Sequence, residues 1–293
     1  MNRIYVFSGL LLLLVSCAPT RSMQTTAMQA TTTDKGQPIL LGQHPRTDLG
    51  QQPFARWFDS GYAAYTPDTA TIAQLTPELK NRTFEIFMGT WCGDSRREVP
   101  RMFKILDACG VPADHIKLVM VDYRDKMYKR SPGHEEAGLD IIHVPDLLVL
   151  DQGREQGRIV ESPVVSLEKD LVAIAKGESY EPQYKGAYWL STITRQSPME
   201  WPGIVDSLRA KTKAESELYI LSYILLLQGD TGRALLVARL NTLAYPNSAL
   251  AYSFMGKICD GCADPVGARR AYRRALELDP KAKNARDWLD AHP

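Results

Sequence analysis

The sequence predicts an α/β domain with a mixed central sheet flanked by helices, followed by an all-α region of helical repeats. Three observations predict this fold class. β-prone runs alternate with helical patterns over residues 51–180, a strand passes through a turn at Gly89 into a helix, and the last third of the chain repeats itself at an offset of 34 residues. The chain has 293 residues, 44% of them hydrophobic, and can bury two cores.

The first seventeen residues have the pattern of a secretory signal peptide. An early cation at Arg3 precedes an apolar run over residues 4–15, which is too short for a stable membrane span. The ending LVSC at Cys17 resembles the lipobox of bacterial lipoproteins, which implies cleavage before Cys17 and attachment of lipid to that residue. Several acyl chains would anchor the protein firmly. An ordinary signal peptide with an incidental cysteine is the alternative.

Export would place the mature chain outside the cytoplasm, where thiols can be oxidised. We therefore expect a lipid-anchored protein of the bacterial cell envelope that faces an extracytoplasmic compartment. Residues 18–50 are rich in Thr, Gln, Ser and Ala and almost lack aromatic residues, which predicts a flexible tether. Within this tether, the apolar residues 38–41 are the one stretch with an alternative reading, as part of the folded domain.

The charge balance argues against a nucleic-acid partner. Lys and Arg number 35 and Asp and Glu number 34, which leaves a formal charge of +1, whereas phosphate binding needs a clustered positive field. We also expect no metal and no cofactor. His134 and His143 are not at helical ligand spacing, and Cys259 and Cys262 have no second Cys or His pair to complete a zinc site.

The α/β domain is predicted element by element. Residues 67–79 contain helix-start residues followed by an interrupted apolar face. Residues 83–88 alternate as a strand does, and the helix over 92–107 has an apolar face that includes Phe103. The remaining predicted elements are strands at 115–122 and 146–150, a hairpin partner at 158–160 after a turn at Gly153, and an amphipathic helix at 167–175.

The last third reads as a helix–turn–helix unit that occurs twice within residues 215–293. Residues 217–246 align with residues 251–280 without a gap, and the second copy resembles the tetratricopeptide repeat in its Gly256, Ala268, Tyr272 and the ending ALELDP. A capping helix should follow, and residues 181–214 should form a helical connector. Such arrays present extended surfaces, so a protein partner on the repeats is one expectation.

The stretch FMGTWCGDSRREVP places Cys92 at the start of a predicted helix. The positive end of the peptide dipoles and the unpaired N–H groups there favour the thiolate. Arg96 and Arg97 add positive charge in the first turn, whereas Asp94 and Glu98 oppose it. Because the thiolate is the form that attacks disulfides, these residues predict a nucleophilic cysteine.

Residues from about 54 to 178 resemble the thioredoxin-like superfamily. The resemblance lies in Trp91-Cys-Gly-Asp-Ser95 at a strand-to-helix junction and in Val144-Pro145 before a later strand. In that family this proline is cis and lies against the reactive cysteine, which implies that role for Pro145. The other residues expected around the sulfur are Trp91, Gly93, Asp94, Arg96 and Val144. The departure is Ser95, since the dithiol members have cysteine at this position.

The resemblance therefore implies a monothiol thiol–disulfide oxidoreductase. Cys92 is the nucleophile, Ser95 and backbone amides steady its thiolate, and Pro145 shapes the groove for the substrate. A serine hydroxyl cannot resolve a mixed disulfide, so an external thiol must do so, as in monothiol glutaredoxins. The expected substrate is a protein disulfide or a low-molecular-weight thiol compound. The alternative is a non-enzymatic scaffold that binds a protein partner at the cell envelope.

The remaining cysteines do not replace the missing one on the same helix. Cys109 lies seventeen residues after Cys92, about 25 Å along a continuous helix, whereas a disulfide needs Cα atoms within about 7 Å. It is expected to be a small buried hydrophobic residue. Cys259 and Cys262 leave three alternatives open: a structural disulfide, a redox pair that serves Cys92, or unpaired cysteines facing the interior of a repeat helix.

Overall fold

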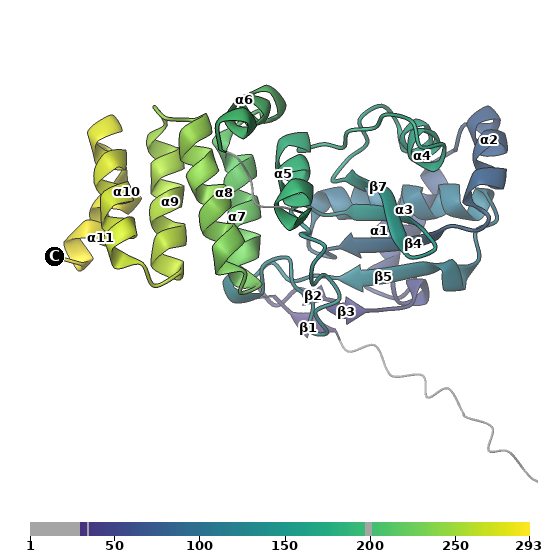
Figure 1. Cartoon of the computed structure of the whole chain (residues 1–293). Coiled ribbons are helices and arrows are strands. Elements are labelled where there is room, and N and C mark those ends of the chain that lie inside the picture. The colour runs from purple at the N-terminus through teal and green to yellow at the C-terminus, as the bar shows by residue number, and fades with distance from the viewer. Residues whose placement is uncertain (1–29, 34, 197–200) are drawn as a thin grey trace, which may run out of the picture.

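The structure of the chain, a computed structural model, describes residues 30–33, 35–196 and 201–293 (Figure 1). The predicted signal peptide, its lipobox at Cys17 and the first part of the predicted tether lie outside these residues. Within the described part, none of the helices combines the length and the apolar character that crossing a membrane requires. Figure 1 shows the α/β domain at one side and a row of packed helices, α5 to α11, at the other; we call this row the helical region.

A five-stranded mixed sheet in the order β3-β5-β4-β6-β7 forms the centre of the α/β domain. β4 and β5 are parallel, and the other neighbouring strands are antiparallel. β4 and β5 end on the side of the helical region (Figure 1). The strands are β3 (Gly42–Gln43), β4 (Thr83–Met88), β5 (Ile116–Met120), β6 (Asp146–Asp151) and β7 (Arg154–Val160).

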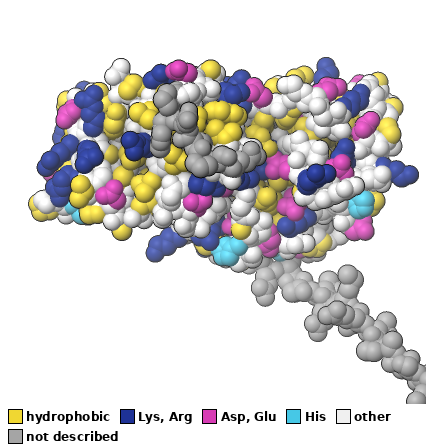
Figure 2. Space-filling model, viewed as in Figure 1, with side chains coloured by type: hydrophobic (Ala, Val, Ile, Leu, Met, Phe, Trp, Pro, Cys, Tyr) yellow, Lys and Arg dark blue, Asp and Glu magenta, His cyan; other side chains and the backbone are white. Residues whose placement is uncertain are grey.

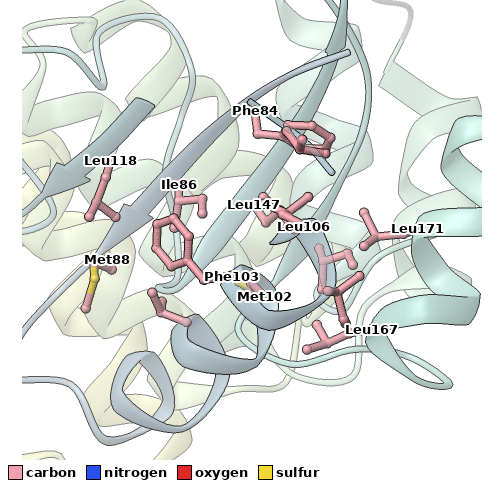
Figure 3. Packing of buried hydrophobic residues seen from close by; sticks show 14 of the residues in the cluster. Phe84, Ile86, Met88, Met102, Phe103, Leu106, Leu118, Leu147, Leu167 and Leu171 are labelled. Atoms are coloured by element: carbon pink, nitrogen blue, oxygen red, sulfur yellow. The ribbon is translucent and has the colours of Figure 1, made fainter. Parts of the chain in front are cut away.

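Four helices cover one face of this sheet. They are α1 (Ala55–Ala64), α2 (Thr69–Leu79), α3 (Gly93–Ala108) and α4 (Leu167–Ala175). Figure 3 shows Met102, Phe103 and Leu106 of α3 packed against inward-facing residues of the sheet, among them Phe84 and Ile86. Full burial of such a side chain stabilises the fold by about 2 kcal/mol, so this layer fixes α3, and with it the residue that precedes α3.

The opposite face of the sheet is covered by the long segment between β5 and β6, residues 121–145, which we call the β5–β6 loop. Ile141 and Val144 of this loop pack with Phe87, Val119 and Leu148 of the sheet, and Trp91 and Cys92 border the same cluster. The candidate cysteine therefore lies next to a small apolar core that the loop completes.

The boundary of the predicted tether is corrected by the structure. Gly42 and Gln43 pair with β5, the Leu40 N–H donates to the Thr90 hydroxyl at 3.2 Å, and Ile39, Leu40 and Leu49 are buried. Residues 38–49 therefore belong to the α/β domain. The apolar side chains of this segment bury in the domain, and its backbone groups pair with β5 and with Thr90.

The helical region consists of seven helices in the described part of the chain. α7 and α8 form one antiparallel pair and α9 and α10 the next, as the 34-residue repeat predicts, and α11 packs on the end. Asp230 and Asp264, which the repeat aligns, cap α8 and α10 in the same way. The helices are α5 (Lys185–Gln196), α6 (Trp201–Lys211), α7 (Glu215–Leu227), α8 (Thr231–Ala244), α9 (Ala249–Gly261), α10 (Pro265–Leu278) and α11 (Lys283–Ala291).

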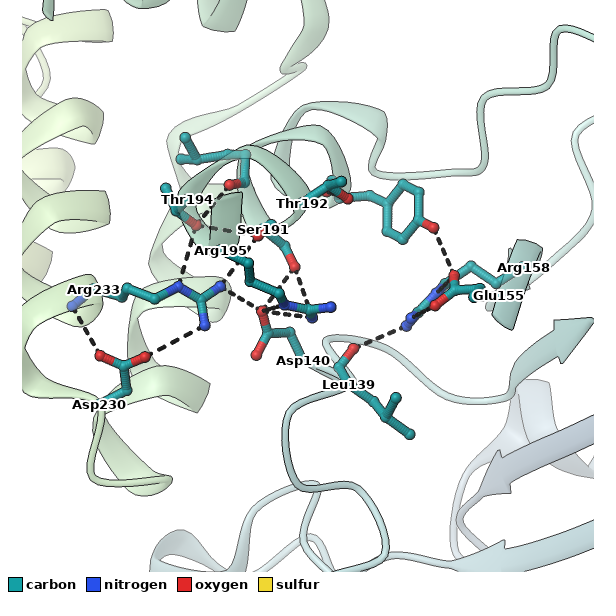
Figure 4. Close-up of polar contacts among 12 residues, drawn as sticks. Leu139, Asp140, Glu155, Arg158, Ser191, Thr192, Thr194, Arg195, Asp230 and Arg233 are labelled. Carbon is teal, nitrogen blue, oxygen red and sulfur yellow. Dashed lines mark hydrogen bonds and ion pairs between the residues drawn. The ribbon is translucent and has the colours of Figure 1, made fainter. Parts of the chain in front are cut away.

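The β5–β6 loop joins the two parts of the molecule. The buried carboxylate of Asp140 accepts from Ser191 at 2.7 Å, from Arg195 at 2.8 Å and from Arg233 at 2.6 Å (Figure 4). Burial alone would raise the pKa of Asp140, but these partners hold it below its ordinary value. Ile142 of the same loop packs into the core of the helical region. Polar and apolar contacts together fix the helical region against the α/β domain.

Candidate functional site

Cys92 lies at the point where β4 passes into α3, half-buried and facing the β5–β6 loop. It is the N-cap residue of α3, and its carbonyl accepts the first helical hydrogen bond, from the Arg96 N–H at 3.1 Å. Its thiol donates to the Val144 carbonyl at 3.3 Å. The Val144–Pro145 peptide bond is cis, as the resemblance implied. The structure therefore brings together Cys92, Val144 and Pro145, which are far apart in the sequence.

Ser95 makes no hydrogen bond to the Cys92 sulfur. It is fully buried, and its hydroxyl accepts from the Gly89 N–H at 3.2 Å. This bond holds the turn that precedes Cys92, so Ser95 acts on the backbone and not on the sulfur that it was expected to steady. The N-cap thiol likewise receives no hydrogen bond from the helix N–H groups. Gly93, the first helical residue, leaves open space where a Cβ atom would lie.

The charged residues of the first turn of α3 have partners of their own. Arg96 donates to the Thr90 carbonyl at 2.7 Å, and Arg97 pairs with Asp94 at 2.7 Å and with Glu98 at 2.6 Å. The two arginines therefore orient the turn and balance the neighbouring carboxylates. Neither has a hydrogen bond to the sulfur.

Trp91 is held in place beside Cys92. Its indole N–H donates to the Val121 carbonyl at 2.8 Å, at the end of β5, and its ring lies 5.6 Å from that of Tyr123. A Cβ atom at Gly89 would come within 2.4 Å of the indole, so the glycine is needed for this close approach. The tryptophan thus forms a fixed wall of the site.

Lys129 is the residue of this site that the sequence interpretation missed. Only 6% of it is exposed, and its ammonium lies over the rings of Trp91, at 5.2 Å, and Tyr128, at 5.1 Å. Burial lowers its pKa to about 8, although the nearby Cys92, Glu161 and Asp94 act in the opposite direction. No local signal marks it, because it stands in the polar stretch DKMYKRS that resembles any exposed loop.

A second group of polar side chains, His143, Glu161 and Tyr184, is linked to the cis proline. His143 stacks on Tyr184 with ring centroids 3.8 Å apart, and its Nδ1 lies 3.3 Å from Glu161. Tyr184 donates a hydrogen bond to the same carboxylate. Burial raises the pKa of Tyr184 and the contact with Glu161 raises it further, so the phenol stays protonated. The Glu161 N–H donates to the Pro145 carbonyl at 2.7 Å, which ties this cluster to the proline.

The helical region forms one side of the site. Tyr128 lies 6.2 Å from Tyr223 of α7, measured between ring centroids. From there an aromatic row continues through Tyr219, 5.8 Å away, to Phe254 of α9, which stacks on Tyr219 at 3.9 Å. Lys257 lies over the rings of Tyr219, at 5.7 Å, and Tyr223, at 4.8 Å. The surroundings of Cys92 are therefore continuous with the inner helices of the repeats.

The other cysteines of the described residues lie elsewhere and are unpaired. Cys109 is buried at the far end of α3, and burial raises its pKa, as suits a small hydrophobic residue. Cys259 and Cys262 are both free thiols, so the structure contains no disulfide between them. Burial and the charge of Asp264 raise the pKa of Cys259 to about 11 and also raise that of Cys262. Both are poor nucleophiles in this state.

No family model, no curated protein and no solved structure matches this chain. Over the described ranges, no cluster of three or more His, Cys, Asp or Glu side chains could hold a metal ion. On the face seen in Figure 2, positive and negative side chains are mixed, and Lys and Arg gather only at the end formed by α10 and α11. The site is therefore defined by its own geometry: a half-buried thiol at a helix start, a cis proline, a buried ammonium and aromatic walls.

Proposed function

We propose that this protein is a thiol–disulfide oxidoreductase of the monothiol type, with a thioredoxin-like domain, tetratricopeptide-like repeats and a lipid anchor at the bacterial cell envelope. The observation that carries the proposal is the position of Cys92, whose half-buried sulfur lies at the start of α3 and 3.3 Å from the carbonyl that precedes the cis proline. A sulfur in this position is accessible and lies at the positive end of a helix.

The reaction needs two exchanges. The Cys92 thiolate attacks one sulfur of a disulfide R–S–S–R′, the S–S bond breaks, and R′–S⁻ leaves while Cys92 and R become joined by a new disulfide. An external thiolate R″–S⁻ then attacks the R sulfur, which releases R–S–S–R″ and restores the Cys92 thiolate. The second exchange uses a thiol from outside because Ser95 has no sulfur, and because burial and the charge of Asp264 raise the pKa of Cys259 and Cys262 and keep both protonated.

Val144 and Pro145 position the substrate in this proposal. The Val144 carbonyl accepts the hydrogen bond of the resting thiol. The loss of the proton breaks that bond, and the carbonyl then becomes free to accept from the main chain of a bound polypeptide. Trp91 and Tyr128 provide apolar walls for the residues that flank the attacked sulfur.

The test is to trap mixed disulfides on the full mature chain and identify them by mass spectrometry. The wild type and a Cys259→Ser/Cys262→Ser variant should both form adducts at Cys92 with oxidised glutathione and with a peptide disulfide, and added thiol should release them. The Cys92→Ser variant should form none. The proposal is contradicted if Cys92 forms no adduct in the native chain but reacts normally once the chain is unfolded.

The envelope location needs its own test. Labelling cells with a fatty-acid probe should mark the wild type and leave Cys17→Ala unlabelled and released from the membrane fraction. Retention of the label in Cys17→Ala would show that the chain is not anchored at this residue.

The aromatic row supports a second candidate function, a scaffold that binds a protein partner without chemistry. Tyr219, Tyr223 and Phe254, with Lys257 above them, offer a stacked surface that does not involve the sulfur. Capture of the same partners by wild type and Cys92→Ala would favour this function, whereas partners lost with the sulfur favour thiol exchange.

A further inference from the structure

We propose that Lys129 is the counter-charge of the Cys92 thiolate, a buried ammonium that sets the pH range over which the sulfur reacts. The inference deepens the function proposed above, and rests on it, by assigning the positive charge of the site to a residue of the β5–β6 loop. The arginines of the Cys92 motif itself have other partners.

The burial of Lys129 is the first step of the argument. A lysine that is 6% exposed is unusual unless its charge is paired. Among the described residues, its ammonium has no hydrogen bond and no ion pair, and it lies only over the rings of Trp91 and Tyr128. Aromatic faces attract a cation but do not replace its lost water. An anion nearby would therefore stabilise the charged form.

The second step concerns which group can supply that anion. The acidic groups that act on the charge of Lys129 are the Cys92 thiol, Glu161 and Asp94, and the ammonium lies 5.2 Å from the ring of Trp91, the residue next to Cys92. Asp94 pairs with Arg97 at 2.7 Å, and Glu161 is shared between His143 and Tyr184. Within the described part of the chain, the one hydrogen bond of the Cys92 sulfur goes to the Val144 carbonyl, and that bond is lost when the thiol ionises. The sulfur is therefore the group whose charge the ammonium can stabilise most.

The phenols around this pair stay neutral. Burial raises the pKa of Tyr128 in the loop, of Tyr223 in α7 and of Tyr184. Tyr219 of α7, which lies next to Tyr223, is the remaining titratable group on that side. Asp94, Glu161 and His143 lie on the other sides of the pair. The nearby cations Arg96, Arg97 and Lys257 are engaged by the Thr90 carbonyl, by Asp94 and Glu98, and by the rings of Tyr219 and Tyr223.

The pH dependence follows from the pair. Below about pH 8 Lys129 carries its proton, so a thiolate at Cys92 has a counter-charge. Loss of the ammonium above that pH leaves the thiolate without it. Conversely, loss of the sulfur leaves the ammonium alone in a buried place, because such coupling is reciprocal. Each partner therefore changes the titration of the other.

The test uses the full mature chain and needs no substrate. The rate of alkylation of Cys92 by iodoacetamide, followed on the isolated peptide by mass spectrometry, is measured from pH 4 to pH 10. Lys129→Met should react about ten-fold more slowly than wild type at pH 7, with the half-maximal pH about one unit higher, and Lys129→Arg should restore most of the rate. Lys126→Met, an exposed lysine of the same loop, is the matched control and should not differ from wild type.

A second measurement covers the case in which Lys129→Met does not fold. The Lys129 side chain is titrated by nuclear magnetic resonance in wild type and in Cys92→Ser, and its pKa should be lower in Cys92→Ser. An unchanged alkylation profile in a folded Lys129→Met, or an unchanged Lys129 titration in Cys92→Ser, overturns the proposal. Neither result depends on turnover of a disulfide, so failure here is distinct from failure of the proposed function.

Discussion

The cysteine at the start of α3 and the two cysteines at the end of α9 have opposite surroundings. Cys92 precedes the first turn of α3, where the helix dipole is positive, and a buried ammonium lies nearby. Cys259 and Cys262 lie at the last turn of α9, where the dipole is negative, next to the carboxylate of Asp264. The first environment places positive charge beside the sulfur, and the second places negative charge there.

This difference teaches that spacing alone does not identify the reactive sulfur. Cys259 and Cys262 have the two-residue separation of a redox motif, yet burial and negative charge keep them protonated and inert. Cys92 lacks a second cysteine but lies at a helix start beside the cis proline, where we propose that it reacts. One measurement on the native chain and three substitutions test this comparison and the contacts around it.

The largest expected effect is the reactivity ratio of the sulfurs themselves. At pH 7 the native chain should alkylate at Cys92 at least about 100-fold faster than at Cys259, because a thiol whose pKa is about 11 is almost wholly protonated there. Peptide mapping after timed exposure to iodoacetamide measures both rates in one sample. In urea the two sulfurs should be alkylated at similar rates. If the rates at Cys92 and Cys259 were also similar in the native chain, the two environments would not differ in the way described.

The second prediction concerns the contact that holds the two regions together. Asp140→Asn removes the carboxylate that Ser191, Arg195 and Arg233 share and should lower the free energy of unfolding by about 3 kcal/mol. Urea unfolding measures it, with Asp206→Asn, an exposed pair with Arg209, as the control with little effect. Since the pKa of Asp140 is lowered, its contribution is complete above the ordinary Asp value of about 3.9 and is lost as the pH falls below it.

A third prediction measures how much stability the buried charge of Lys129 costs when the Cys92 sulfur is absent. At pH 7 the protein that keeps Lys129 has this lysine protonated both when folded and when unfolded, but only the folded protein has to bury the charge. In a Cys92→Ser background, Lys129→Met should therefore raise the free energy of unfolding at pH 7 by about 1–3 kcal/mol. Between pH 8 and 10.5 the unfolded protein still binds the proton that the folded protein has lost at Lys129, so the protein that keeps Lys129 becomes more stable as the pH rises. The difference in stability between it and Lys129→Met therefore shrinks over this range. A pH-independent loss of stability would show that Lys129 serves packing alone.

The smallest effect is expected at Asp264. Asp264→Asn keeps the cap on α10, since asparagine is also a good N-cap residue, but removes the charge that raises the pKa of Cys262. Alkylation of Cys262 at pH 8 should become about two- to three-fold faster, with unfolding changed by less than about 0.5 kcal/mol. Asp230→Asn, the same cap one repeat earlier, should leave Cys262 unchanged.

The local patterns of the sequence predicted most of the fold. The alternation over residues 83–88, the apolar face that includes Phe103 and the repeat that aligns Asp230 with Asp264 each depend on neighbours in the chain. The boundary at residue 50 was wrong because the partner of Gly42 is Met120, far along the sequence. Pairing of so short a strand has no local signature.

The site was predictable to the same extent. The position of Cys92 beside the cis Pro145 was predicted from the resemblance. The partner of the Ser95 hydroxyl was not, because the hydrogen bond that it accepts from the Gly89 N–H depends on the exact shape of the turn. Lys129 was missed because a loop lysine becomes buried only when Trp91 and Tyr128 close over it. Three-dimensional enclosure of a charge cannot be seen in a one-dimensional pattern.

The β5–β6 loop has a consequence for anyone who would rebuild this protein from parts. A single segment, residues 121–145, supplies Lys129 to the cysteine, Asp140 to two arginines of the helical region and Ile142 to its core. A chimera cut at the sequence boundary near residue 181 would separate the repeats from the residues that fit them. Exchange of the helical region for another therefore requires transplanting this loop, and a new loop would bring different charges to the half of the molecule that contains Cys92.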